Sequence, residues 1–129
     1  MTYENLLAEY DELLDITERK MLHEGLYADG CIWVNKNLPT ARKACILAEE
    51  IGHYFTSTGD ILDTKKPDNF KQELRARKWA YNKVVPIERI VEAAGKGNVT
   101  LWDMAEYLDV DEEFLKNCLM HYGILDLSL

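Results

Sequence analysis

The chain has 129 residues, of which 47% are hydrophobic, and this length and apolar content predict one globular domain with a single core. Its net charge of −8 disfavours a general nucleic-acid binder, because such proteins neutralise phosphates with Lys and Arg. Three scattered cysteines without a C-x-x-C pair exclude a disulfide framework, and with no leader-like or bilayer-length apolar run we expect a cytoplasmic protein.

The first third of the chain predicts a helix and then a β-hairpin. Apolar residues recur at three- and four-residue steps over residues 4–22, which indicates an amphipathic helix that ends before Gly25. Within residues 26–35, two β-prone runs flank Asp29 and Gly30, a dipeptide that readily adopts the positive φ angles of a tight turn. This is the only clear sheet signal, so we expect the flanking helices to pack on the hairpin.

The remainder of the chain predicts helices separated by turn signals. Pro39 suits an opening turn, Pro86 stops a helix, and Gly123 closes the last one. Thr100 and Asp111 are suited to N-cap two short helices. We expect helices at about 39–55, 69–84, 86–94, 101–108 and 112–121, with residues 56–68 forming mostly a loop.

Charge is unevenly distributed along these elements. Eight of the fifteen Lys and Arg residues fall between residues 64 and 89, a cluster that could dock an acidic partner. Solvated helix faces are the favoured interpretation, because most charge runs are of this kind. The tail from residue 101 has a helix–turn–helix rhythm, typical of DNA binding. Its second helix opens with Asp111 and Glu112, however, whose charge opposes phosphate, so packing or protein contact is the favoured role.

The most informative segment is Leu47–Tyr54, which places polar groups on an otherwise apolar helix. Glu49 and His53 are four residues apart, so their side chains lie on one face about one turn apart. The same spacing lets H-E-x-x-H helices bind zinc. Glu50 then corresponds to the general base that takes a proton from the metal-activated water and delivers it to the leaving amine.

A catalytic zinc needs a third protein ligand, and Glu73 on the next long helix could supply it. Ala48–Tyr54 resembles the active helix of the ImmA/IrrE metallo-endopeptidases, and Gln72–Ala80, followed by Pro86, resembles their third-ligand helix. Gly25–Ile32 is similar to the hairpin of members that phages and mobile elements encode. The resemblance covers about residues 5–92.

This resemblance implies an α+β, mostly helical, minigluzincin-like fold, with a small antiparallel sheet or hairpin packed on an active-site helix. We expect residues 1–96 to form the metallopeptidase-like domain, and residues 97–129 a C-terminal helical appendage sharing its core. The resemblance also implies a cytoplasmic zinc metallopeptidase, a hydrolase acting on a regulatory protein such as a phage or mobile-element helix–turn–helix repressor. Neither membrane nor direct nucleic-acid binding is expected.

The sequence departs from the family motif at one position, because Glu49 stands where H-E-x-x-H has its first histidine. Glu49, His53 and Glu73 can still offer three ligands, with Glu50 as catalytic base, for zinc or another divalent metal such as manganese. Two anionic ligands would reduce the Lewis acidity of the ion. The alternative is a metal-free, catalytically degenerate domain that acts as a protein-binding anti-repressor module.

Each candidate residue also has a structural interpretation. His53 could be a hydrogen-bonded core histidine, Glu49 a surface carboxylate, and Glu73 a partner of Arg77 at i,i+4. Cys45 is better explained as a buried, inert thiol than as a ligand. The strand 31–35 is either structural or a sheet edge for an extended peptide. Four further residues are candidates for water-side or oxyanion groups: His23, Asp60, Tyr81 and His121.

Overall fold

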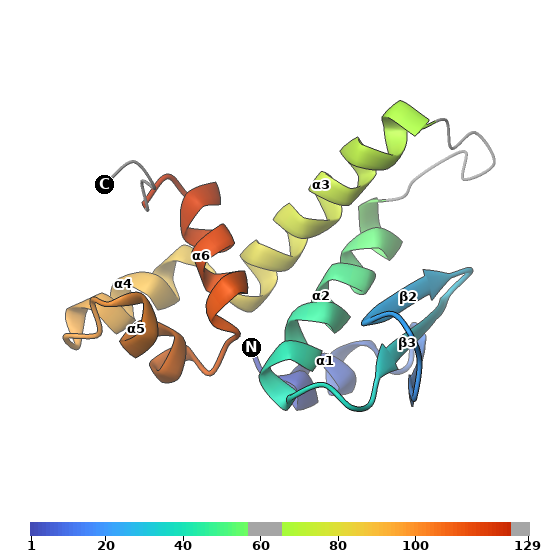
Figure 1. Cartoon of the computed structure of the whole chain (residues 1–129), viewed down its shortest axis with the longest axis horizontal. Helices are drawn as coiled ribbons and strands as arrows, with labels where there is room; N and C mark the ends of the chain where they lie inside the picture. The colour runs from blue at the N-terminus through green and yellow to red at the C-terminus, as the bar shows by residue number, and fades with distance from the viewer. Residues whose placement is uncertain (57–65, 125–129) are drawn as a thin grey trace.

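The computed structural model describes residues 1–56 and 66–124, with the side chains of residues 66–69 left aside. Over these residues the chain forms six helices and one three-stranded mixed sheet, which confirms the expected small α+β fold. The sheet lies on one side of helix α2, and the C-terminal helices lie beyond helix α3 on the other (Figure 1). No helix in these ranges is both long and apolar enough to cross a membrane.

The N-terminal segment is where the sequence-based prediction is wrong. Helix α1 spans only Tyr3–Tyr10, and strand β1 follows at Asp15–Arg19, where one long helix was expected. Strand β1 pairs in parallel with strand β3, Cys31–Asn35, with Ile16 opposite Ile32. Each pairing joins residues that are sixteen apart in the chain, so no local pattern in the sequence indicates it. In the folded protein the pairing with β3 overrides the helical spacing of the apolar residues.

The predicted hairpin is confirmed. Strand β2, Gly25–Ala28, pairs antiparallel with β3, and the two turn residues have φ angles of 52° at Asp29 and 83° at Gly30. The strand order is β1-β3-β2, so β3 lies in the centre of the sheet. The suggestion that residues 31–35 form a sheet edge for a peptide is therefore wrong, because both sides of β3 are already paired, and β2 is an edge strand instead.

The helices of the second half follow the predicted pattern, apart from small shifts at their ends. Thr100 and Asp111 cap helices α5 and α6 as expected, since their side chains accept the backbone N–H groups of Asp103 and Phe114. Part of the predicted loop is helical, because α3 begins at Lys66, whereas residues 57–65 lie outside the described ranges. The helices are α2 Thr40–Thr56, α3 Lys66–Val84, α4 Ile87–Gly95, α5 Leu101–Leu108 and α6 Glu112–His121.

One cluster of buried apolar side chains joins these elements. It extends from Leu6 of α1 and Ile32 of the sheet, through Leu47 and Ile51 of α2, to Leu115 of α6. The two central helices approach each other closely at Gly52, where an added Cβ would lie 2.5 Å from the backbone oxygen of Ala76. Only a glycine fits at this crossing. The close approach also brings polar residues of α2 that neighbour Gly52 near to α3.

The crossing gives the first testable prediction. Gly52→Ala should destabilise the protein by roughly 2–3 kcal/mol, because the new methyl group must push a backbone carbonyl aside, which outweighs the better helix propensity of alanine. Urea unfolding measures the change. The matched control is Gly95→Ala, where an added Cβ meets nothing within 4 Å. Equal stability of the two variants would contradict the steric constraint at Gly52.

Candidate functional site

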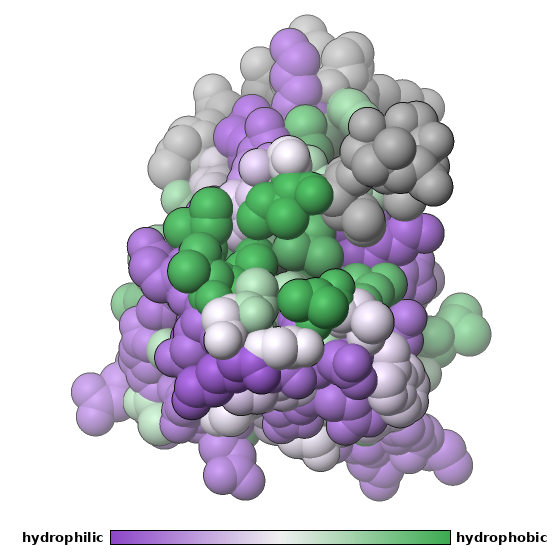
Figure 2. Space-filling model, turned by 90° about the vertical axis from the view of Figure 1, so that its left-hand side faces the viewer, coloured by the Kyte–Doolittle hydropathy of each residue, from purple (hydrophilic) through white to green (hydrophobic). Residues whose placement is uncertain are grey.

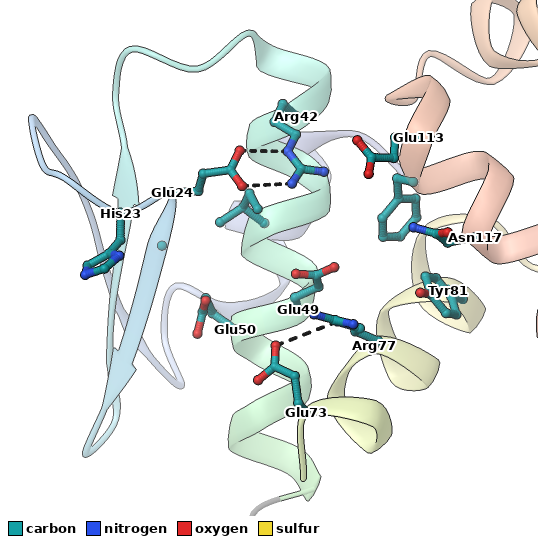
Figure 3. A pocket seen from close by; sticks show the side chains of 13 residues that line it. His23, Glu24, Arg42, Glu49, Glu50, Glu73, Arg77, Tyr81, Glu113 and Asn117 are labelled. Carbon is teal, nitrogen blue, oxygen red and sulfur yellow. Dashed lines mark hydrogen bonds and ion pairs between the residues drawn. The ribbon is translucent and has the colours of Figure 1, made fainter. Parts of the chain in front are cut away.

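A polar pocket of about 420 Å³ lies between α2, α3, the start of β2 and the start of α6 (Figure 3). Five glutamates and two arginines line it, so the pocket carries an excess of negative charge. The lining residues are His23, Glu24, Gly25, Arg42, Ile46, Glu49, Glu50, Glu73, Arg77, Tyr81, Glu113, Phe114 and Asn117. The pocket therefore contains three of the four residues for which the sequence predicted a metal-binding or catalytic role.

His53 and Glu73 are brought together as the sequence analysis expected. Nε2 of His53 lies 3.0 Å from Oε2 of Glu73, and the two side chains are 19% and 43% exposed. The contact depends on the crossing of α2 and α3, since Gly52 immediately precedes His53 and packs on Ala76. An imidazole and a carboxylate thus meet from two helices at one point.

Glu73 has a second partner on its own helix. Its Oε1 lies 3.8 Å from Nε of Arg77, one turn further along α3. The i,i+4 pair that was the structural alternative for Glu73 therefore exists beside the contact with His53. In Figure 3 the guanidinium of Arg77 points toward Glu49 as well as Glu73.

Glu49 lies on the pocket wall one turn before His53. Burial raises the pKa of its carboxyl group to about 6, although the nearby positive charges of Arg77 and Arg42 oppose this shift. A surface carboxylate would show no such desolvation. Within the described ranges, no three His, Cys, Asp or Glu side chains are grouped closely enough to hold one metal ion, so Glu49 does not join His53 and Glu73 in this arrangement.

Glu50 projects from α2 toward the sheet side of the pocket (Figure 3). Burial, and then the charges of Glu49 and Glu73, raise its pKa to about 7. Gly25 of β2 packs closely over it, because a Cβ added at Gly25 would lie 3.2 Å from Oε2 of Glu50. A carboxyl group with this pKa can both accept and release a proton near neutral pH, which is what a general acid–base group requires.

The rim of the pocket contains residues that the sequence analysis missed. Arg42 pairs with Glu24 at 2.8 Å and with Asp111 at 3.4 Å, and so joins the segment before β2 to the cap of α6. These partners lie 18 and 69 residues from Arg42, and no local motif could have revealed them.

The remaining candidates have different outcomes. His23 and Tyr81 line the pocket, whereas the ring of His121 packs 5.4 Å from that of Tyr81 and is absent from the wall. Cys45 is fully buried, and burial raises the pKa of its thiol to about 12, which supports the inert interpretation. Asp60 lies outside the described residues.

The donor atoms suit a divalent cation, although the geometry is incomplete. One imidazole and carboxylates from two helices are ligands for zinc or manganese, and His53 already meets Glu73. Glu49 is the additional carboxylate on the same helical face, and Arg77 is a positive charge beside these groups. Binding an ion with three protein ligands therefore requires at least one of these side chains to move.

Two comparisons with known proteins bear on this arrangement. The family model described as Peptidase_M78, IrrE N-terminal-like domain, matches residues 2–120, which is nearly the whole chain. No curated protein matches the chain.

The pKa of Glu50 predicts how stability depends on pH. Because folding raises this pKa from 4.5 to about 7, the folded state binds the proton more tightly, and its stabilisation is lost as pH rises through that interval. Metal-free protein should lose on the order of 2 kcal/mol of unfolding free energy between pH 5 and 7.5 through this group. Glu50→Gln should remove that part of the loss.

Urea unfolding in the presence of a chelator, at several pH values, measures how the unfolding free energy of the wild type and of Glu50→Gln depends on pH. The control is Glu12→Gln, which removes an exposed carboxyl group outside the pocket and should leave the pH dependence unchanged. A Glu50→Gln variant with the wild-type slope would show that Glu50 is not desolvated.

Proposed function

Because the chain belongs to the Peptidase_M78 family of IrrE N-terminal-like domains, we propose that it is a metal-dependent endopeptidase that uses Glu50 as its general base. The observation that carries the proposal is the half-buried carboxyl group of Glu50, whose pKa is raised to about 7 by desolvation. It lies in a pocket that Glu73 also lines, and the side chain of Glu73 contacts His53. His53, Glu73 and Glu49 are the proposed ligands. When bound, a divalent cation would supply Lewis acidity for attack on a peptide carbonyl.

The protein groups around the ion have separate roles in this proposal. Glu50 accepts a proton from the attacking water and then protonates the leaving amine, for which its pKa is suited. Strand β2 is an edge of the sheet and its first residue, Gly25, lines the pocket, so an extended substrate can pair with β2 and pass over Glu50. We therefore propose β2 as the strand that pairs with the substrate, in place of the strand 31–35 that the sequence analysis had considered.

The proposed substrate is a regulatory protein, in particular a helix–turn–helix repressor of a phage or mobile element. The family membership supports proteolysis. The choice of a repressor as substrate rests on the resemblance to members that phages and mobile elements encode. We propose that the protein acts in the cytoplasm, where such a repressor is found.

The first test combines metal content with cleavage. Purified protein should carry about one divalent ion per chain by mass spectrometry of the metal, and His53→Ala should lose it. Glu50→Gln should keep the ion and reduce cleavage of a co-expressed repressor, encoded by a neighbouring gene, by about 10²–10⁴-fold. Glu12→Gln serves as the control. Cleavage by Glu50→Gln at the wild-type rate would rule out Glu50 as the base.

A second candidate, a protein-binding module without catalysis, is favoured by the surface of the C-terminal helices. Figure 2 shows apolar side chains gathered on that face of the molecule. Among the exposed large apolar residues of these helices are Ile87, Val91, Trp102 and Met120, with Val91 66% exposed. Apolar surface gathered in this way is typical of protein contacts.

The second candidate predicts that binding resides on this face and does not need Glu50. Val91→Asp should weaken repressor binding by about tenfold in calorimetry, because it places a charge in an apolar contact, whereas Glu50→Gln should bind normally. The control is Leu22→Asp, at a residue that is 94% exposed and lies in the segment before β2. Equal binding by the Val91 and Leu22 variants would exclude the face as the contact.

A further inference from the structure

Arg77 places a permanent positive charge in the pocket proposed to bind the metal. Its side chain comes from α3, is half exposed, and lines the pocket together with Glu49, Glu50 and Glu73. A guanidinium group carries its positive charge throughout the physiological pH range. The site therefore contains a cation of its own before any ion arrives.

The guanidinium lies beside two of the carboxylates that an ion would use. Its Nε lies 3.8 Å from Oε1 of Glu73, and Figure 3 shows it directed between Glu73 and Glu49. The other oxygen of Glu73 is within 3.0 Å of His53. One carboxylate is thus shared between the imidazole and the guanidinium, and a dication at the same place would stand close to a like charge.

The two arginines of the pocket are held differently. Arg42 makes two short contacts with Glu24, from Nε at 2.9 Å and from Nη2 at 2.8 Å, and its side chain is 25% exposed. Arg77 has one long contact and a side chain that is 50% exposed. A long side chain with a single, solvent-screened contact can turn into water at little cost, whereas a two-point contact holds Arg42 in place.

We propose that Arg77 is an intramolecular counter-ion which competes with a divalent cation for Glu73 and Glu49, so that metal binds only when the guanidinium turns out of the pocket. Arg77 neutralises part of the carboxylate charge while the ion is absent. This inference builds on the proposed function, because it concerns the same ligands. It also predicts a change in metal affinity that does not depend on catalysis.

The test is calorimetric titration of Zn²⁺ into the chelator-treated full chain. Arg77→Gln should bind Zn²⁺ about two- to fivefold more tightly than wild type, since the competing charge is gone, and Arg77→Lys should fall between them. The matched control is Arg75→Gln, which removes an equal charge from an exposed position of the same helix outside the pocket. Without metal, Arg77→Gln should have a lower Tm than Arg75→Gln, and Zn²⁺ should reverse the order.

The outcomes separate this inference from the proposed function. If wild type binds Zn²⁺ and the Gln variants at 77 and 75 have equal affinity, competition is excluded and the metallopeptidase proposal stands. If Arg77→Gln binds Zn²⁺ and wild type does not, competition is supported. The natural protein is then metal-free, which supports the protein-binding module over the metallopeptidase. If no variant binds Zn²⁺ or, in the same titration, Mn²⁺, both the competition and the metal-dependent chemistry are overturned.

Discussion

The crossing of α2 and α3 at Gly52 is the constraint on which the site depends. Helix α2 presents its backbone, without any side chain, to the carbonyl of Ala76, and this brings the next residue, His53, to Glu73. A wider crossing would separate the two helices by the thickness of a methyl group or more and break a 3.0 Å contact. The meeting of His53 and Glu73 therefore depends on one close approach between the two helices.

The charges of the pocket follow from where these helices place them. Three glutamates of α2 and α3 face one cavity, and burial raises the pKa of Glu49 and Glu50 because water no longer solvates their charged forms. The arginines offset only part of this cost. An excess of desolvated carboxylate favours any cation, whether it comes from solvent or from the chain itself.

Much of the helical half could be predicted from the sequence, and so could the contact between His53 and Glu73, although Glu49 does not join them. The caps at Thr100 and Asp111 and the turn at Asp29-Gly30 are encoded by adjacent residues, and the i,i+4 spacing of Glu49 and His53 is local as well. Strand β1 could not be predicted, because its pairing with β3 is a non-local parallel contact. The same limit applies to the rim, where Arg42 and Asp111 meet only after the chain has folded.

Asp111 performs two tasks, since its side chain caps α6 and also receives Arg42 from α2. Close to this point, Glu113, Phe114 and Asn117 form one wall of the pocket, and the ring of Phe114 packs 5.3 Å from that of Tyr81 on α3. A fragment truncated at residue 96 would keep every proposed ligand and yet leave the cavity open along that wall. During synthesis on the ribosome, likewise, the pocket is completed only once α6 has emerged and docked.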